Sequence, residues 1–171
     1  FVEDISVGRV NPRDIELAID TSARQAHLQQ HLQQVLTAED LPEAIASVQP
    51  VIPPYAALRS QLAHYRALAE QYPQAPTLPP LTGKKLVAGE SWVGTPVLAN
   101  WLIVLGYLPA GTVVTELYAD AVVEGVKSFQ QQHGQIPDGV IGKQTYQNLQ
   151  MPLQDRVHKI ELAMERLRWM D

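Results

Sequence analysis

The sequence contains no cysteine among its 171 residues, which excludes disulfides, thiolate metal sites and a cysteine nucleophile within it. Lys and Arg number 13 against 18 Asp and Glu, and no basic block occurs. Nucleic acids and anionic membrane surfaces are therefore poor candidates as partners. No apolar run reaches the length of a membrane span, and no basic-then-apolar leader opens the chain. Because Phe1 is not a natural start, we expect that an upstream segment has been removed.

The sequence also has no convincing combination of residues for catalysis or for metal binding. His27 and His31 are spaced four apart and would share one helical face, but no Glu lies between them and no third ligand is close. We favour an exposed helix over a metal site there, and we predict neither a metal nor a cofactor. No paired carboxylates, Gly-rich phosphate loop or Ser-His-Asp set is present, so no catalytic residue is predicted.

Proline, by contrast, is abundant and clustered. The 13 prolines gather at 50–54 and 73–80, and both groups interrupt helices. The segment Ala23 to Leu36 is rich in Gln, Leu and Ala and predicts a helix. Asp40 predicts the N-cap of the next helix, with proline early in its first turn.

Two longer segments have apolar residues at helical spacing. In 55–72 they are Leu58, Leu62, Tyr65, Ala69 and Tyr72. In 153–169 they are Leu153, Val157, Ile160, Met164 and Leu167. Two matched apolar seams predict helices that pack together. We therefore predict a helical scaffold in residues 1–80 and 151–171, with a separate module in 81–150 between its two parts. The proline-rich segment 73–89 is predicted to be the hinge into this module.

The segment 121–149 has the most informative pattern. Val122, Val126, Phe129 and His133 share one helical face, and Gly134 follows as a left-handed helix stop. An Asp-Gly pair at 138–139 predicts a tight turn, and Gly142 then leads into a short helix over 143–149. An earlier helix is predicted over 96–105, ended by Gly106.

The pairs Phe129-Gln130 and His133-Gly134, followed by Asp138-Gly139, Gly142 and Thr145, resemble the small three-helix type of peptidoglycan-binding module. The resemblance implies an all-α fold, with this three-helix module inserted between helices of a small helical scaffold domain. It also implies peptidoglycan, by its glycan or its stem peptide, as the partner. We expect the motif residues to build the module rather than to touch the ligand. They are Phe129, His133, Gly134, Asp138, Gly139, Gly142 and Thr145.

Ligand contact is expected from polar and aromatic side chains that the fold does not need. Peptidoglycan offers N-acetyl sugars with apolar faces and amides, and stem peptides that carry both signs of charge. Aromatic rings and side-chain amides suit such a ligand. The candidates by type and position are Tyr107, Gln130, Gln131, Gln135 and Tyr146. Trp92 and Trp101 are instead predicted to pack inside the module.

The flanking segments resemble the scaffold of the large, multi-domain L,D-transpeptidases of Gram-negative bacteria. The resemblance is carried by Gly8 to Pro12, by Tyr55 to Leu68 and by Arg156 to Trp169. It implies a parent cysteine acyltransferase of the periplasm that makes 3–3 cross-links in cell-wall biogenesis and is anchored to the inner membrane by a removed N-terminal segment. The catalytic domain would be a partner of this chain, alongside other cell-wall synthesis proteins.

The catalytic domain of that family is absent from these residues, so the chain is expected to be a non-catalytic fragment. Trp169 is expected to pack against the missing domain. Asp171 stands where the family usually has proline, which is a departure from its pattern.

Two other functions remain open on the sequence alone. The module could serve another wall enzyme, such as an amidase or a zinc carboxypeptidase. The chain could also be a protein-docking scaffold that does not bind glycan.

Overall fold

The computed structural model describes residues 1–170, which contain nine α-helices, one 3-10 helix and no strands. Two isolated β-bridges join Leu86 to Ile141 and Ser91 to Leu117. The predicted all-α fold is therefore confirmed. Asp171, noted above as a departure from the family pattern, lies outside the described residues.

The chain divides into two compact units. Unit 1 combines Phe1–Ala67 with the chain from Gln154 onward, and unit 2 is the continuous segment Leu68–Leu153. Unit 2 is thus an insertion in the sequence of unit 1. The divisions fall at 67/68 and 153/154, whereas the sequence predicted them at 80/81 and 150/151.

The first part of unit 1 is a series of short helices. Its elements are α1 Val2–Ser6, η1 Pro12–Ile15, α2 Ser22–Ala26, α3 Leu28–Leu36 and α4 Leu41–Ser47. The single helix predicted over 23–36 is wrong, because the chain breaks at His27, whose N–H bonds to the carbonyl of Arg24 in a tightened turn. Asp40 caps α4 as predicted, with its carboxylate accepting from the N–H of Glu43 at 3.0 Å.

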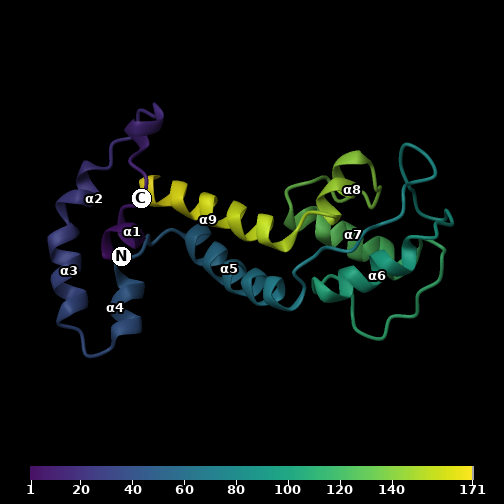
Figure 1. Ribbon diagram of the computed structural model, residues 1–171, viewed down its shortest axis with the longest axis horizontal. Coiled ribbons are helices and arrows are strands. Elements are labelled where there is room, and N and C mark those ends of the chain that lie inside the picture. Colours follow the sequence, from purple (N-terminus) through teal and green to yellow (C-terminus); the bar gives the residue numbers. More distant parts are fainter. Residues whose placement is uncertain (171) are drawn as a thin grey trace. The chain divides into compact units, whose positions relative to one another are not determined.

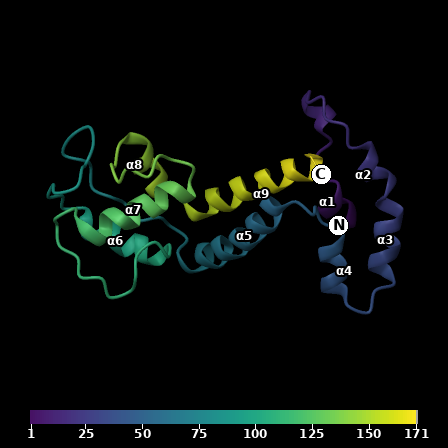
Figure 2. The ribbon, with the colours of Figure 1, turned by 180° about the vertical axis from the view of Figure 1, so that it is seen from behind.

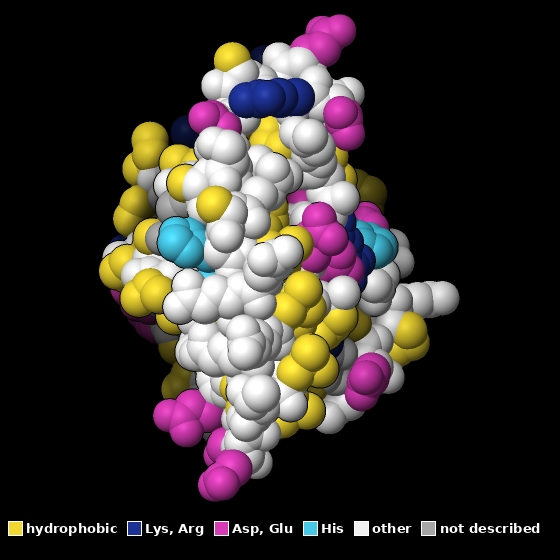
Figure 3. Space-filling model, turned by 90° about the vertical axis from the view of Figure 1, so that its left-hand side faces the viewer, with side chains coloured by type: hydrophobic (Ala, Val, Ile, Leu, Met, Phe, Trp, Pro, Cys, Tyr) yellow, Lys and Arg dark blue, Asp and Glu magenta, His cyan; other side chains and the backbone are white. Residues whose placement is uncertain are grey.

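Figure 3 views the molecule from the end at which α2, α3 and α4 lie, and it shows hydrophobic side chains interspersed with uncharged polar surface. Neither α2 nor α3 contains a buried residue. These two helices consequently contribute little to the core of unit 1.

Two long helices, α5 Pro53–Gln71 and α9 Leu153–Met170, lie side by side, and most of each belongs to unit 1 (Figures 1 and 2). Near the start of α5, the Tyr55 hydroxyl accepts from Nε of Arg168 at 3.1 Å. Further along α5, Arg66 pairs with Glu161 at 2.6 Å. Since rising numbers on one helix meet falling numbers on the other, the pair is antiparallel. Its buried hydrophobic side chains within unit 1 are Tyr55, Leu62, Tyr65, Val157, Met164 and Trp169.

A buried carboxylate joins the N-terminal segment to α9. Glu165 is only 8% exposed, and its Oε1 accepts from the backbone N–H groups of Arg9 and Val10. Its Oε2 accepts from Arg168 at 2.7 Å. The backbone N–H groups of the segment after α1 therefore find their acceptor in a side chain more than 150 residues away in sequence.

Gly8 lies directly against this carboxylate. Its φ is +112°, and a Cβ added there would sit 2.7 Å from a Glu165 oxygen and 2.9 Å from Nε1 of Trp169. The Trp169 side chain is buried within unit 1, at 7% exposure. Trp169 therefore packs within unit 1, and its expected contact with a further domain stays a prediction.

Unit 2 contains the predicted three-helix module, formed by α6 Thr95–Val104, α7 Asp120–Gln132 and α8 Lys143–Leu149. Figures 1 and 2 show α6 alongside α7. The core comes from all three helices and from the loops between them. Its side chains with 1% exposure or less include Trp92, Leu98, Leu102, Tyr118, Val126, Phe129, Ile141 and Leu149.

The segment 73–89, predicted to be a hinge, is instead tied to the module. Leu78 is 2% exposed, and its N–H bonds to the side chain of Gln150 at 3.2 Å. The Tyr146 hydroxyl bonds to the carbonyl of Leu78 at 2.8 Å, and Trp92 donates to the carbonyl of Pro80 at 3.1 Å. These bonds hold residues 78–80 against the module.

No helix among residues 1–170 combines the length and the apolar character needed to cross a membrane.

Gly8→Ala is expected to destabilise unit 1. The substitution places a side chain in a left-handed backbone conformation and against Glu165, so we expect a loss of about 2–4 kcal/mol. Hydrogen exchange of the α9 amides measures this unit separately from the module. Gly83→Ala is the control, because Gly83 has no positive φ and its nearest neighbour to an added Cβ is 3.8 Å away. Equal exchange rates in the two variants would contradict the assigned role of Gly8.

Candidate functional site

The loop between α7 and α8 is organised by one buried side-chain amide. Gln130 on α7 is 2% exposed, and its Oε1 accepts from the N–H of Gly139 at 2.8 Å. Its Nε2 donates to the Asp138 carboxylate and to the Val140 carbonyl, both at 3.0 Å, with a longer contact of 3.3 Å to the Thr145 hydroxyl. Three consecutive loop residues and α8 are thus held by a single amide.

Asp138 completes the turn at the surface. Its Oδ1 accepts from the N–H of Val140 at 2.8 Å, and this bond is the main reason that the pKa of Asp138 is lowered. The bond from Gln130, the backbone N–H of Asp138 itself and the positive charge of Lys85 act in the same direction. The ionised carboxylate therefore stabilises the turn.

The glycines of the loop adopt the conformations that the turn requires. Gly134 ends α7 with φ +65° and Gly139 has φ +75°, so both occupy the left-handed region. An added Cβ at Gly139 would also lie 2.8 Å from Val123. Gly142 is the extended N-cap residue of α8.

Thr145 helps to build the module, as expected of a motif residue. Its hydroxyl donates to Oε1 of Gln135 at 3.1 Å while it receives the contact from Gln130, so it ties α8 to α7 and to the residues that follow α7.

Three aromatic rings pack together at the C-terminal end of α7. Phe129 and His133 are parallel, with centroids 4.1 Å apart, and the half-buried ring of Tyr107 meets both edge-on. The Nδ1 of His133 lies 2.7 Å from the carbonyl of Phe129, which can only accept, so this ring nitrogen carries the proton. His133 therefore packs and hydrogen-bonds within the module.

The five predicted ligand-contact residues fall into different places. Gln130 is buried and its amide is fully used by the loop, so its assignment to ligand contact is corrected to a structural role. Gln131, the next residue, is exposed on α7. Gln135 is half-buried, and its Nε2 has no hydrogen-bond partner in the structure of residues 1–170. Tyr107 lies beside His133, whereas the Tyr146 hydroxyl faces the carbonyls of Leu78 and Pro79.

Aromatic residues elsewhere in the module are structural. Trp92 and Trp101 are buried as predicted, and Trp101 donates to the carbonyl of Leu149 at 2.9 Å. Tyr118 was missed by the sequence reasoning. It is completely buried and its hydroxyl donates to the carbonyl of Gly139 at 2.6 Å, while burial raises its pKa well above the ordinary value. Its position just before α7 gave no periodic signal.

Metal-binding geometry is absent from the described part of the chain, where no group of three or more His, Cys, Asp and Glu is placed to hold an ion. The His27 and His31 rings lie 6.4 Å apart. Partial burial is the main cause that lowers the pKa of His31, with Arg24 and His27 adding to it.

Gln130→Ala is expected to destabilise unit 2, because it leaves the buried N–H of Gly139 without its acceptor. A single unsatisfied buried group of this kind costs about 1–3 kcal/mol. The measurement is the midpoint of urea unfolding followed by near-UV circular dichroism. Gln131→Ala is a matched control on the exposed side of the same helix and should leave the midpoint unchanged. A mutant midpoint equal to that control would show that the amide does not hold the loop.

The module is also expected to lose stability in acid through Asp138. The pKa of this carboxyl is lower in the folded state, so its contribution is complete above the unfolded value, near pH 4, and disappears as the pH falls through the folded value. Asp138→Asn should therefore show a smaller loss between pH 6 and pH 2 than the parent. Identical pH profiles of the two unfolding midpoints would contradict this.

Comparison with known families gives two matches, one to each unit. Residues 1–62 match the Scaffold domain family, and residues 96–149 match the peptidoglycan binding domain family. Among curated proteins, none matches this chain in sequence. The second match spans α6, α7, α8 and the loop organised by Gln130. These matches support a peptidoglycan-binding module in unit 2, beside a scaffold domain, and peptidoglycan as its partner.

Proposed function

We propose that this chain binds peptidoglycan through residues 96–149 and positions a tethered L,D-transpeptidase domain at the cell wall. The observation that carries the proposal is the coincidence of the family match with a complete three-helix module. The motif residues in it are used for folding, which leaves other side chains free for the ligand.

The surface at the C-terminal end of α7 is best suited to the ligand. Tyr107 offers the accessible part of a ring that can stack on the apolar face of an N-acetyl sugar. The exposed amide of Gln131 can both donate to and accept from acetamido groups. Gln135 is the weakest of these candidates, because its Oε1 accepts from Thr145 and its unpartnered Nε2 is buried within the described residues. The Tyr146 ring is a further candidate, but its hydroxyl is occupied by the fold.

The scaffold part of the proposal rests on the flanking resemblance and on the match to the Scaffold domain family. This chain has no cysteine, so the acyl transfer that forms 3–3 cross-links would belong to a separate domain of a periplasmic, membrane-anchored parent. A wall-binding module raises the local substrate concentration for such a tethered enzyme even when its own affinity is weak. The proposal also includes other cell-wall synthesis proteins as partners.

A wall amidase or carboxypeptidase, or a docking scaffold without glycan binding, remains an alternative. The first differs from our proposal only in the attached enzyme, which the parent gene beyond Asp171 would identify. The second is separated by binding to protein-free sacculi.

Co-sedimentation with purified sacculi tests the binding. The bound fraction should fall only modestly between low and high salt, because the net charge of −5 leaves little counterion release to drive association. Gln131→Ala should weaken binding by about threefold to tenfold, the cost of roughly one hydrogen bond, without changing the unfolding midpoint. Gln147→Ala, an exposed glutamine on α8, is the matched control. Absence of sedimentation with protein-free sacculi would favour the docking alternative.

A further inference from the structure

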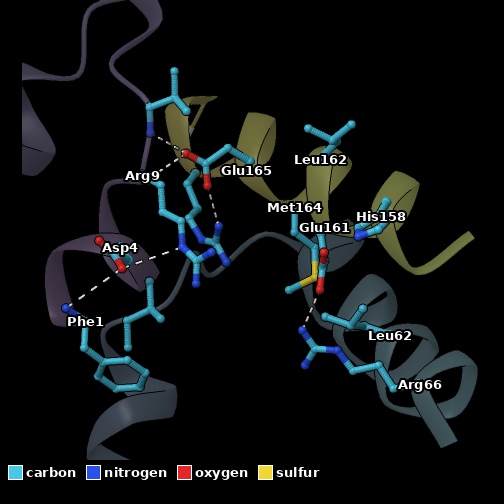
Figure 4. Close-up of a pocket in the computed structure, with 13 residues that line it drawn as sticks. Phe1, Asp4, Arg9, Leu62, Arg66, His158, Glu161, Leu162, Met164 and Glu165 are labelled. Carbon is cyan, nitrogen blue, oxygen red and sulfur yellow. Dashed lines mark hydrogen bonds and ion pairs between the residues drawn. The ribbon is translucent and has the colours of Figure 1, made fainter. Parts of the chain in front are cut away.

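Unit 1 contains a cavity of about 590 Å³ that the proposed function of the module does not use. It lies between α1, α5, α9 and the segment that follows α1, as Figure 4 shows. Its volume is within the range of pockets that hold small ligands, about 300–1,000 Å³. Every lining residue belongs to unit 1, so the cavity is complete within that unit.

Part of the cavity wall is apolar. Leu62 from α5 and Met164 from α9 are 9% and 4% exposed and line it from two sides. Leu162 is 59% exposed on the same helix as Met164, and it presents a large apolar side chain to a ligand without being part of the core. Such a surface binds small apolar groups more favourably than fully hydrated polar groups.

Two exposed ion pairs between side chains line the same cavity. Arg66 and Glu161 are 2.6 Å apart, with side chains 57% and 39% exposed. Arg9 and Asp4 are 3.6 Å apart, with side chains 77% and 42% exposed. Exposed pairs of this kind contribute at most about 1 kcal/mol, so a ligand with matching charges can exchange partners with them at little cost.

The third side-chain ion pair in the cavity stabilises the fold. Glu165 and Arg168 are 2.7 Å apart with side chains only 11% and 14% exposed, and Glu165 also holds the Arg9 and Val10 backbone. The Arg9 side chain, however, is free of that task, because it is the backbone N–H of Arg9 that Glu165 binds. The exchangeable charges of the cavity are therefore those of the two exposed pairs.

We infer that this cavity binds a short peptide that carries carboxylates and an ammonium group, with small apolar side chains between them. Among the components of the wall, the stem peptide of peptidoglycan has this chemistry, whereas the glycan has no ammonium group. The inference rests on the proposed function for the choice of stem peptide as the source. It gives the scaffold a ligand of its own, separate from the sugar contacts of the module.

A titration of the isotope-labelled chain with a synthetic stem tetrapeptide, L-alanyl-γ-D-glutamyl-diaminopimelyl-D-alanine, tests the inference by NMR. The backbone amides of Arg9, Val10 and Leu162 should shift in a saturable way. Arg66→Gln should weaken binding by about fivefold, the equivalent of one exposed ion pair. Lys159→Gln removes the same charge from an exposed position of α9 that does not line the cavity, so it should bind as the parent does.

Leu162→Glu provides a second variant that leaves the core intact, since this side chain is mostly exposed. It should weaken binding of the tetrapeptide, because it places a charge on the apolar surface. No saturable shift in the parent, or equal weakening by Lys159→Gln and Arg66→Gln, would overturn the inference. Equal affinity for an all-L peptide with the same charges would overturn the assignment to stem peptide.

The two proposals fail separately. Binding to sacculi without shifts in the cavity would leave the module's function standing and remove this site. Saturable shifts with the tetrapeptide, together with sacculus binding that Arg66→Gln weakens and Gln131→Ala leaves unchanged, would leave this site standing and remove the ligand contacts assigned to the module.

Discussion

The buried amide of Gln130 is the interaction on which the module depends. A glutamine side chain supplies one acceptor and two donors at fixed angles, and here all are directed at the 138–140 turn and at α8. An irregular loop cannot satisfy its own backbone groups in the way a helix does. The amide replaces the missing regular partners, which allows Gly139 and Val140 to lie against α7 without an unsatisfied buried group.

In unit 1 a charged side chain accepts hydrogen bonds from an irregular backbone segment. The backbone that follows α1 is irregular, and Glu165 accepts two of its N–H groups from inside α9. Arg168 neutralises the carboxylate, as burial of an ionised group requires. In both units a polar side chain on a helix therefore fixes the position of a loop, and in unit 1 that loop lines the cavity at Arg9 and Val10.

Sequence patterns predicted the features that depend on neighbours along the chain. The spacing of Val122, Val126 and Phe129 located the apolar face of α7, and Asp40 marked the start of α4. Gln130 was predicted to contact the ligand because its side-chain amide suits a sugar. No local sequence pattern shows that residues 138–145 fold back and bury it. The proline segment was taken for a hinge for a similar reason. Proline predicts an extended backbone but not the surface against which Leu78 packs.

The contact of Glu165 with the backbone of Arg9 spans 156 positions of sequence. During synthesis, the N-terminal segment of unit 1 must therefore wait for α9 to leave the ribosome, while unit 2 is already complete at Leu153. Contacts this far apart in sequence are slow to form, because the chain between them must be closed into a loop first. A folded unit 2 shortens that effective loop, so the inserted module would act as an intramolecular aid to the maturation of the scaffold around it.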